Sequence, residues 1–295
     1  MARLRGHMPK KQLQTIPWWR RAKNFAAIGS IGLATVIVIL PLVLILGTVL
    51  YKGIGSLDWN LFTQIPKPAG ELGGGMANGI AGSVMILMIA SIIGIPLGIG
   101  SGVFLAEYGR NIYGNIVRFT ADVLNGVPSI VIGLTAYALV VVVQGHFSLL
   151  AGGIALGIMM IPTVSRTTEE VLLMVPQTIR EAALGLGIPH WRTTLSVVLP
   201  SARSGIITSI MLAFARIAGE TAPLMFTAFG NQFWSTKLNQ PTAALPLQIF
   251  TYAVSGFEDQ RRQAWAGAFV LIVMIVGTVL IVRFITSRGA LKGAN

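Results

Sequence analysis

Residues 25–50 read FAAIGSIGLATVIVILPLVLILGTVL, a run of 26 residues without a charged side chain. A helix of about 20 apolar residues is long enough to cross the hydrocarbon core of a bilayer. The run also exceeds the roughly 7–15 apolar residues of a secretion signal, and no small-residue cleavage pattern follows it. We therefore predict that this segment is a permanent transmembrane helix.

Five further segments have the length and apolar character of a membrane span, and they cover residues 78–105, 121–143, 147–164, 205–229 and 264–285. The whole chain of 295 residues is 54% hydrophobic and only 11% charged, which excludes a soluble globule because its surface would be too apolar. The absence of cysteine excludes a disulfide-built secreted protein. The sequence predicts an all-α polytopic membrane protein with six transmembrane helices.

The basic residues predict the orientation of these helices, because cytoplasmic loops carry an excess of Lys and Arg. Sixteen of the 22 Lys and Arg residues fall in segments that share one side of the membrane, and five fall on the other. Both termini are therefore predicted to be cytoplasmic. The net charge of +12 is then a topology signal and not a sign of nucleic-acid binding.

The predicted organisation has four parts. A basic cytoplasmic segment covers residues 1–24, the first transmembrane helix residues 25–50, the core domain residues 76–286 and a cytoplasmic tail residues 287–295. The longest cytoplasmic loop, residues 165–204, belongs to the core.

Glycines and prolines inside the spans carry packing information. Small residues four positions apart line one helix face and let two backbones approach closely, as in Gly94, Gly98 and Gly102 of the second span and Gly153 and Gly157 of the fourth. Prolines are expected to kink or interrupt three spans, at Pro96, Pro128 and Pro223. Broken helices are tolerated at membrane depth only against protein or a wet cavity, so a bundle around a path is expected.

Enzyme signatures are missing from the sequence. It contains neither a G-x-x-x-x-G-K-[ST] phosphate loop nor a G-x-S-x-G elbow, and the three histidines, His7, His146 and His190, lack metal-ligand spacing. We predict that the chain is not an enzyme and holds no cofactor or metal. Energy for active transport must then come from another polypeptide or from an ion gradient.

The long cytoplasmic loop contains the stretch EAALGLG at residues 181–187, and Pro200 follows thirteen residues later. Glu181 is expected to begin a short helix, where it would suit the positive end of the helix dipole. Ala182 and Ala183 favour a helix and leave a smooth face, while Gly187 and Pro189 end the element. The pattern predicts a helix–turn–helix that either binds a partner or lies by itself at the membrane surface.

This stretch resembles the EAA motif of the membrane subunits of binding-protein-dependent ABC importers, although Val197 stands where isoleucine is more usual. The resemblance implies the type I ABC importer permease fold. It also implies that Glu181, Ala182, Ala183 and Gly187 form a coupling helix, which is seated in a groove of a separate ATPase subunit that holds ATP and Mg.

The fifth span contains two ionisable residues, Arg216 and Glu220, which are expected on one helix face because they are four residues apart. An ionisable residue at mid-membrane costs about 2.5–3.5 kcal/mol on insertion scales. The two side chains either neutralise each other or steady a neighbouring helix, or they form an anion path in which the Arg216 guanidinium binds an oxyanion. In that path Glu220 keeps the anion from being trapped or accepts a hydrogen bond from a protonated phosphate oxygen.

Four stretches are similar to those of phosphate-specific ABC permeases: ARIAGETAPL at 215–224, NGVPSIV at 125–131, FLAEYG at 104–109 and AALPLQIF at 243–250. The last favours the PstA type over its PstC-type partner. The resemblance implies that Arg216, Glu220, Thr221, Asn125 and Ser129 line the path. It further implies a PstC-like permease, a PstB-like ATPase dimer and a PstS-like phosphate-binding protein as partners, in a bacterial or archaeal cytoplasmic membrane.

Three alternatives remain open at this point. The first is a permease subunit for another oxyanion, such as sulfate, molybdate or a phosphonate. The second is a gradient-driven transporter or channel, which the scarcity of buried acids disfavours. The third is a membrane scaffold or sensor whose cytoplasmic loop binds a signalling partner.

Overall fold

The computed structural model describes residues 17–292, and it describes side-chain environments through residue 286. Residues 1–16 of the predicted N-terminal segment, residues 1–24, lie outside the described residues. Residues 293–295 of the predicted tail, residues 287–295, also lie outside them. The regular secondary structure of the described part is helical, apart from one isolated β-bridge between Phe229 and Thr242, and this confirms the all-α prediction.

The helices follow one another along the chain without an intervening sheet in the described residues. Their bounds are α1 (Trp18–Gly55), α2 (Asn60–Thr63), α3 (Ala77–Glu107), α4 (Ile112–Gly126), α5 (Ser129–Ala136), the π-helix η1 (Tyr137–Val141), α6 (Val142–Gln144), α7 (Leu149–Leu173), α8 (Gln177–Gly185), α9 (His190–Thr193), the π-helix η2 (Thr194–Val198), α10 (Leu199–Ala218), α11 (Ala222–Thr227), α12 (Leu245–Ala253) and α13 (Glu258–Lys292).

Within residues 17–292, five helices are long and apolar enough to cross a membrane. They are Trp18–Gly55, Ala77–Glu107, Leu149–Leu173, His190–Ala218 and Glu258–Thr286. A sixth span is the pair Ile112–Gly126 and Ser129–Gln144, which bends by 106° at its break. The polytopic prediction is confirmed, with six spans if the bent pair is one of them.

The predicted fifth span, residues 205–229, is wrong at its outer end. The helix stops at Ala218 and a separate helix, α11, begins at Ala222. Pro223 lies in the first turn of α11, the position where its missing N–H costs least. Its ring would clash with the carbonyl of Gly219 in a continuous helix. Hydropathy alone did not place this break because apolar residues lie on both sides of it, although Pro223 indicated an interruption.

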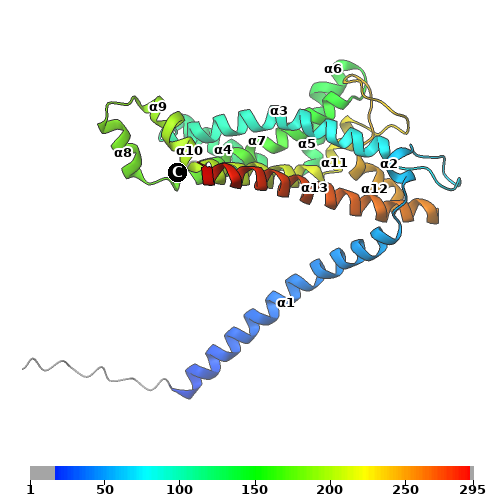
Figure 1. Ribbon diagram of the computed structural model, residues 1–295, viewed down its shortest axis with the longest axis horizontal. Coiled ribbons are helices and arrows are strands. Elements are labelled where there is room, and N and C mark those ends of the chain that lie inside the picture. The colour runs from blue at the N-terminus through cyan, green and yellow to red at the C-terminus, as the bar shows by residue number, and fades with distance from the viewer. Residues whose placement is uncertain (1–16, 293–295) are drawn as a thin grey trace, which may run out of the picture. The chain divides into compact units, whose positions relative to one another are not determined.

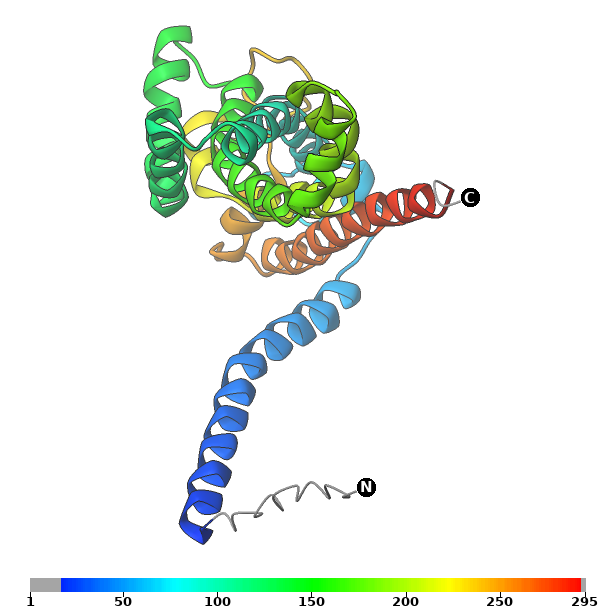
Figure 2. The same ribbon diagram turned by 90° about the vertical axis from the view of Figure 1, so that its left-hand side faces the viewer.

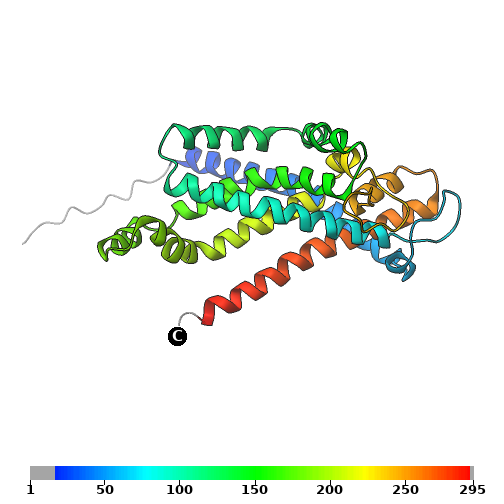
Figure 3. The same ribbon diagram turned by 90° about the horizontal axis from the view of Figure 1, so that it is seen from above.

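Residue contacts divide the chain into Met1–Thr48 and Val49–Asn295. In the larger unit, α3, α7, α10 and α13 run lengthwise, with α8 and α9 at one end and α2, α6 and α12 at the other (Figure 1). Figure 2 views this bundle from the α8–α9 end, and Figure 3 shows α13 separating from the other helices toward its C-terminal end.

The contact between α3 and α7 is the most extensive in the bundle. An added Cβ would lie 2.7 Å from Met160 Cβ at Gly94, 2.6 Å from Val164 Cβ at Gly98 and 2.7 Å from Thr168 Cβ at Gly102. Such distances are too short for real Cβ atoms, so the two backbones approach as closely as they do because these residues are glycine. The predicted packing role of the glycine series is therefore confirmed.

We predict that Gly98→Ala destabilises the bundle because the new methyl group overlaps the side chain of Val164. Overpacking of this kind costs about 1–3 kcal/mol. The measurement is the thermal unfolding midpoint in detergent. Gly100→Ala is the matched control on the same helix, because nothing lies within 4 Å of its added Cβ. Equal midpoints for the two variants would contradict the packing role.

Candidate functional site

Two spans break inside the bundle, and the two breaks lie side by side. α4 and α5 are separated by Val127 and Pro128, and α10 and α11 by residues 219–221. The short helices that follow pack closely, since a Cβ at Gly133 of α5 would lie 2.7 Å from the Cα of Pro223 in α11. The predicted interruptions at Pro128 and Pro223 are confirmed, whereas α3 continues through Pro96.

Arg216 lies in the last turn of α10, next to these breaks, and its side chain is exposed. Its Nη1 donates a hydrogen bond to Thr163 Oγ1 at 3.2 Å, and Thr163 Oγ1 donates to Asn125 Oδ1 at 3.1 Å. Thr163 is the fifteenth of the 25 residues of α7, about 21 Å from the first residue of that helix. The guanidinium is therefore near the middle of the bundle.

The expectation that Arg216 and Glu220 share one helix face is wrong, and the alternative in which the two side chains neutralise each other is not what the structure shows. α10 ends at Ala218, so Glu220 lies in the turn after the helix and not one helical turn along the same face. Among the described side chains, Arg216 forms no ion pair and its one hydrogen-bond partner is the neutral hydroxyl of Thr163. A guanidinium has five N–H donors, so most of its donors remain available.

The other predicted path residues lie at the ends of the broken helices. Glu220 and Thr221 are partly buried in the break before α11, and Ser129 begins α5. The structure joins Asn125 to Arg216 through Thr163, a residue that sequence reasoning missed. Its only signal was a hydroxyl within an otherwise apolar span, and such hydroxyls are common in transmembrane helices.

A buried ionic cluster lies farther along α7, toward the α8–α9 end. The Glu169 side chain is 3% exposed and accepts hydrogen bonds from Arg118 Nε at 2.6 Å and from Arg166 Nη1 at 2.5 Å. Arg118 also donates to the carbonyl oxygens of Leu105 and Gly109, and Arg166 contacts Asp122 at 2.9 Å. The cluster fixes α4 and the end of α3 to α7.

The helix of the EAA motif is α8. Glu181 is its fifth residue and not its first, so the expectation that Glu181 benefits from the N-terminal dipole is wrong. Glu181 and Ala182 are exposed, whereas Ala183 is buried. The predicted helix–turn–helix is confirmed, because α8 turns into α9 at Pro189.

Gly187 forms the turn between α8 and α9. Its φ is +80°, and its N–H donates to Leu184 O at 2.9 Å while the next N–H, of Ile188, donates to Ala183 O at 3.3 Å. These two bonds define a Schellman motif, in which glycine is favoured because other residues are strained at positive φ. The glycine of the motif thus has a conformational role.

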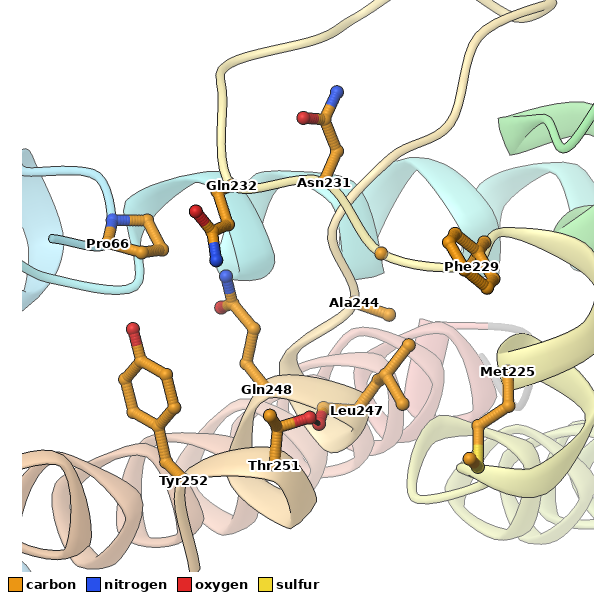
Figure 4. Close-up of a pocket in the computed structure, with 11 residues that line it drawn as sticks. Pro66, Met225, Phe229, Asn231, Gln232, Ala244, Leu247, Gln248, Thr251 and Tyr252 are labelled. Atoms are coloured by element: carbon orange, nitrogen blue, oxygen red, sulfur yellow. Dashed lines mark hydrogen bonds between the residues drawn. The ribbon is translucent and has the colours of Figure 1, made fainter. Parts of the chain in front are cut away.

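A pocket of about 360 Å³ lies at the opposite end of the bundle (Figure 4). Gln248 and Leu247 come from the AALPLQIF stretch, and Gln232, Phe229 and Tyr252 form other parts of the wall. Burial, together with the Asp259 carboxylate, raises the pKa of Tyr252, so its hydroxyl stays protonated. The lining residues carry no charge, so the pocket does not suit the binding of an isolated anion.

Metal-ligating residues do not gather in the part of the chain that the structure describes: no group of three His, Cys, Asp or Glu side chains there could hold a metal ion. The ionisable side chains that do gather are of opposite charge, with Glu169 between Arg118 and Arg166 and Glu107 beside Arg180.

Comparison with known proteins shows the family to which the chain belongs. The sequence profile described as "Binding-protein-dependent transport system inner membrane component" matches residues 94–288. The chain belongs to this family. The matched residues of this chain include both broken spans, α8 and the region around Arg216.

Individual relatives agree with the family. The chain is 45% identical to the phosphate transport system permease protein PstA of Yersinia pestis over 272 residues. The aligned residues cover 92% of this chain and 92% of the relative. It is 45% identical to the PstA of Xylella fastidiosa, covering 87% of this chain and 90% of the relative. It is 34% identical to the PstA of Mycobacterium leprae, covering 94% and 93%. The resemblance to PstA-type permeases is confirmed.

A solved structure confirms the predicted type I fold. The inward-facing MetNI methionine ABC transporter matches with a TM-score of 0.55 at 18% identity, covering 72% of this chain and 94% of the matched chain. The chain is therefore a multi-pass protein of the inner membrane with the fold of a type I ABC importer permease.

We predict that Gly187→Ala loosens the α8–α9 turn, because an alanine at left-handed φ costs about 1–2 kcal/mol. Amide hydrogen exchange in α8 and α9 should become faster. Gly185→Ala is the control, since Gly185 lies inside α8 without a positive φ, and alanine favours a helix there. Unchanged exchange in Gly187→Ala would rule out a conformational requirement for glycine.

Proposed function

We propose that this chain is the membrane-spanning permease subunit of an ATP-driven phosphate importer and forms half of its translocation pathway. The relatives named as phosphate transport permeases support phosphate over sulfate, molybdate or a phosphonate. The chain itself performs no covalent chemistry in this proposal. It lines part of the path of the phosphate ion and transmits the conformational change of a separate ATPase subunit to the membrane helices.

The observation that carries the proposal is the position of Arg216. Its guanidinium is near mid-bundle, exposed, and bonded only to a neutral hydroxyl among the described residues. A planar fork of N–H donors matches the oxygens of an oxyanion. A side chain with spare donors, and without a carboxylate to neutralise it, can bind a passing anion and release it.

Neighbouring polar groups complete the proposed path. Asn125 reaches Arg216 through Thr163, while Ser129 begins α5 and Thr221 directly precedes α11. Glu220 lies four residues beyond Arg216 without pairing with it in the described structure, so its carboxylate can limit trapping of the anion or accept a hydrogen bond from a protonated phosphate oxygen. In a single subunit this face is open, which suits a path between two permeases.

The assembly contains three other kinds of chain in this proposal. A PstC-like permease supplies the second half of the path, a PstB-like ATPase dimer binds ATP and Mg, and a PstS-like protein delivers phosphate from outside. Helix α8 docks on the ATPase through its exposed Glu181 and Ala182, while Ala183 packs inward and Gly187 shapes the turn. The chain lies in a bacterial or archaeal cytoplasmic membrane with both termini cytoplasmic, so α8 projects into the cytoplasm.

We predict that Arg216→Gln abolishes phosphate uptake while the complex still assembles, because a neutral amide cannot supply the charge and the fork of donors. The measurement is uptake of labelled phosphate into proteoliposomes that contain the four components. Arg203→Gln is the control, because Arg203 is an exposed arginine at the other end of α10. Normal uptake by Arg216→Gln, or uptake of labelled sulfate in place of phosphate by the wild type, would refute the assignment.

We predict that Glu181→Ala weakens the coupling of transport to ATP hydrolysis, because it removes an exposed charge from the docking face of α8. Phosphate transported per ATP hydrolysed should fall severalfold. The control is Glu71→Ala, an exposed carboxylate outside α8. An unchanged ratio for Glu181→Ala would count against the docking role.

A further inference from the structure

We propose that Arg180, the residue before Glu181, is the positioning residue that fixes the coupling helix to the transmembrane bundle. This inference rests on the proposed function, because it assigns to α8 the task of passing motion from an ATPase to the membrane helices. It adds a specific point of attachment. Arg180 joins α8 to the ends of α3 and α7 at the same time.

The contacts of Arg180 reach two other helices. Its Nη2 and Nε donate to Glu107 Oε1 at 2.9 and 3.2 Å, and Glu107 is the last residue of α3. Nη2 also donates to the carbonyl oxygen of Leu172 at 2.8 Å, and Nη1 donates to that of Val175. Leu172 lies in the last turn of α7, where helix carbonyls have no partner within the helix, and Val175 lies two residues beyond the end of α7.

This attachment is buried and electrostatically favourable. The Arg180 side chain is 11% exposed and that of Glu107 is 3% exposed. A buried carboxylate requires a partner, and a cation is stabilised at the C-terminal end of a helix. A guanidinium can donate to a carboxylate and to two carbonyls together, because its donors point in several fixed directions. A lysine ammonium is a compact point charge and cannot reproduce that geometry.

Glu107 also lies close to α9, through His190. His190 Nε2 lies 3.8 Å from Glu107 Oε2, and the His190 ring packs edge-on against Tyr108 with centroids 5.1 Å apart. The two oxygens of one carboxylate thus face the two helices of the cytoplasmic helix–turn–helix. By contrast, the cluster around Glu169 involves α3, α4 and α7 and leaves α8 untouched.

The orientation of α8 agrees with a transmitting role. Arg180 faces the bundle while Glu181 and Ala182 are exposed, so adjacent residues of one short helix face the bundle and a partner. The helices that Arg180 joins, α3 and α7, are also the most extensively packed pair. α7 carries Thr163, the hydrogen-bond partner of Arg216, so displacement of α8 acts on the helix beside the anion path.

The test compares Arg180→Gln, Arg180→Lys and Glu107→Gln in the reconstituted four-component transporter. We expect the complexes to assemble and hydrolyse ATP, while phosphate moved per ATP falls at least tenfold in the two Gln variants and partly in Arg180→Lys. The double variant Arg180→Gln/Glu107→Gln should be no worse than the poorer single variant, since both remove one contact. Arg110→Gln is the control, an exposed arginine three residues beyond Glu107.

A merely structural role would give a different result. The amount of complex and its ATPase rate would fall together, while phosphate moved per ATP stayed at the wild-type value. That outcome, or a normal ratio in Arg180→Gln, overturns the proposal.

A second measurement separates this proposal from the identity of the transported ion. The chain has no cysteine, so spin labels can be attached to Leu184→Cys on α8 and Gly100→Cys on α3, both exposed positions. We expect one narrow distance distribution with Arg180 present and a broad one in Arg180→Gln. If wild-type protein does not transport phosphate but the broadening occurs, the ion is wrong and the attachment stands. If phosphate is transported and the distribution is unchanged, the attachment is wrong.

Discussion

The close approach of α3 and α7 is the constraint on which the rest of the structure depends. Glycines at 94, 98 and 102 bring the α3 backbone against Met160, Val164 and Thr168 of α7. No hydrophobic driving force favours helix association in lipid, so close packing of this kind supplies much of the attraction. The pair then holds both functional regions, because α7 carries Thr163 at its middle and Glu169 farther along, and α3 ends at Glu107.

The broken spans follow from a second requirement, that backbone groups at membrane depth find partners inside the protein. At the α4–α5 break, Val127 N–H bonds to Val123 O, and at the α10–α11 break, Glu220 N–H bonds to Ile217 O. The short helices then pack against each other at Gly133 and Pro223. These bonds satisfy one backbone N–H group at each break, and the breaks leave polar side chains near the middle of the bundle.

The sequence predicted the parts of the fold that depend on composition and spacing. Apolar runs identified the spans, and the glycine series identified helix faces that pack closely. The EAA stretch identified α8 and its terminal glycine. The end of α10 was misjudged because residues 222–229 are mostly apolar, so the apolar pattern continues beyond the end of the helix, although Pro223 indicated an interruption. That error also placed Glu220 on the face of Arg216.

Long-range partners could not be predicted, because nothing in the local sequence marks them. Thr163 is 53 residues from Arg216, and Glu107 is 73 residues from Arg180. Each is an ordinary polar residue in its own segment and acquires a role only when α3, α7 and α10 are brought together. The resemblance to a family supplied candidate residues, but the geometry supplied their contacts.

These contacts constrain how movement can reach the middle of the membrane. α8 is nine residues long and has a single arginine, so a force on its exposed face reaches the bundle through Arg180, through the packing of α8 against η2 and through the chain itself. Packed helices transmit displacement because their interiors are dense and yield little. Since α3 and α7 are packed along their glycine faces, they respond as one body.

Arg216 is on α10, outside that pair, and its single hydrogen bond to Thr163 crosses the boundary between α10 and α7. A shift of α7 relative to α10 therefore changes the surroundings of the guanidinium by breaking one charge-assisted hydrogen bond to a hydroxyl, which is worth about 1.5–3 kcal/mol. A buried carboxylate partner at that position would resist such a shift more strongly, and none of the described residues supplies one to Arg216 at the proposed anion site.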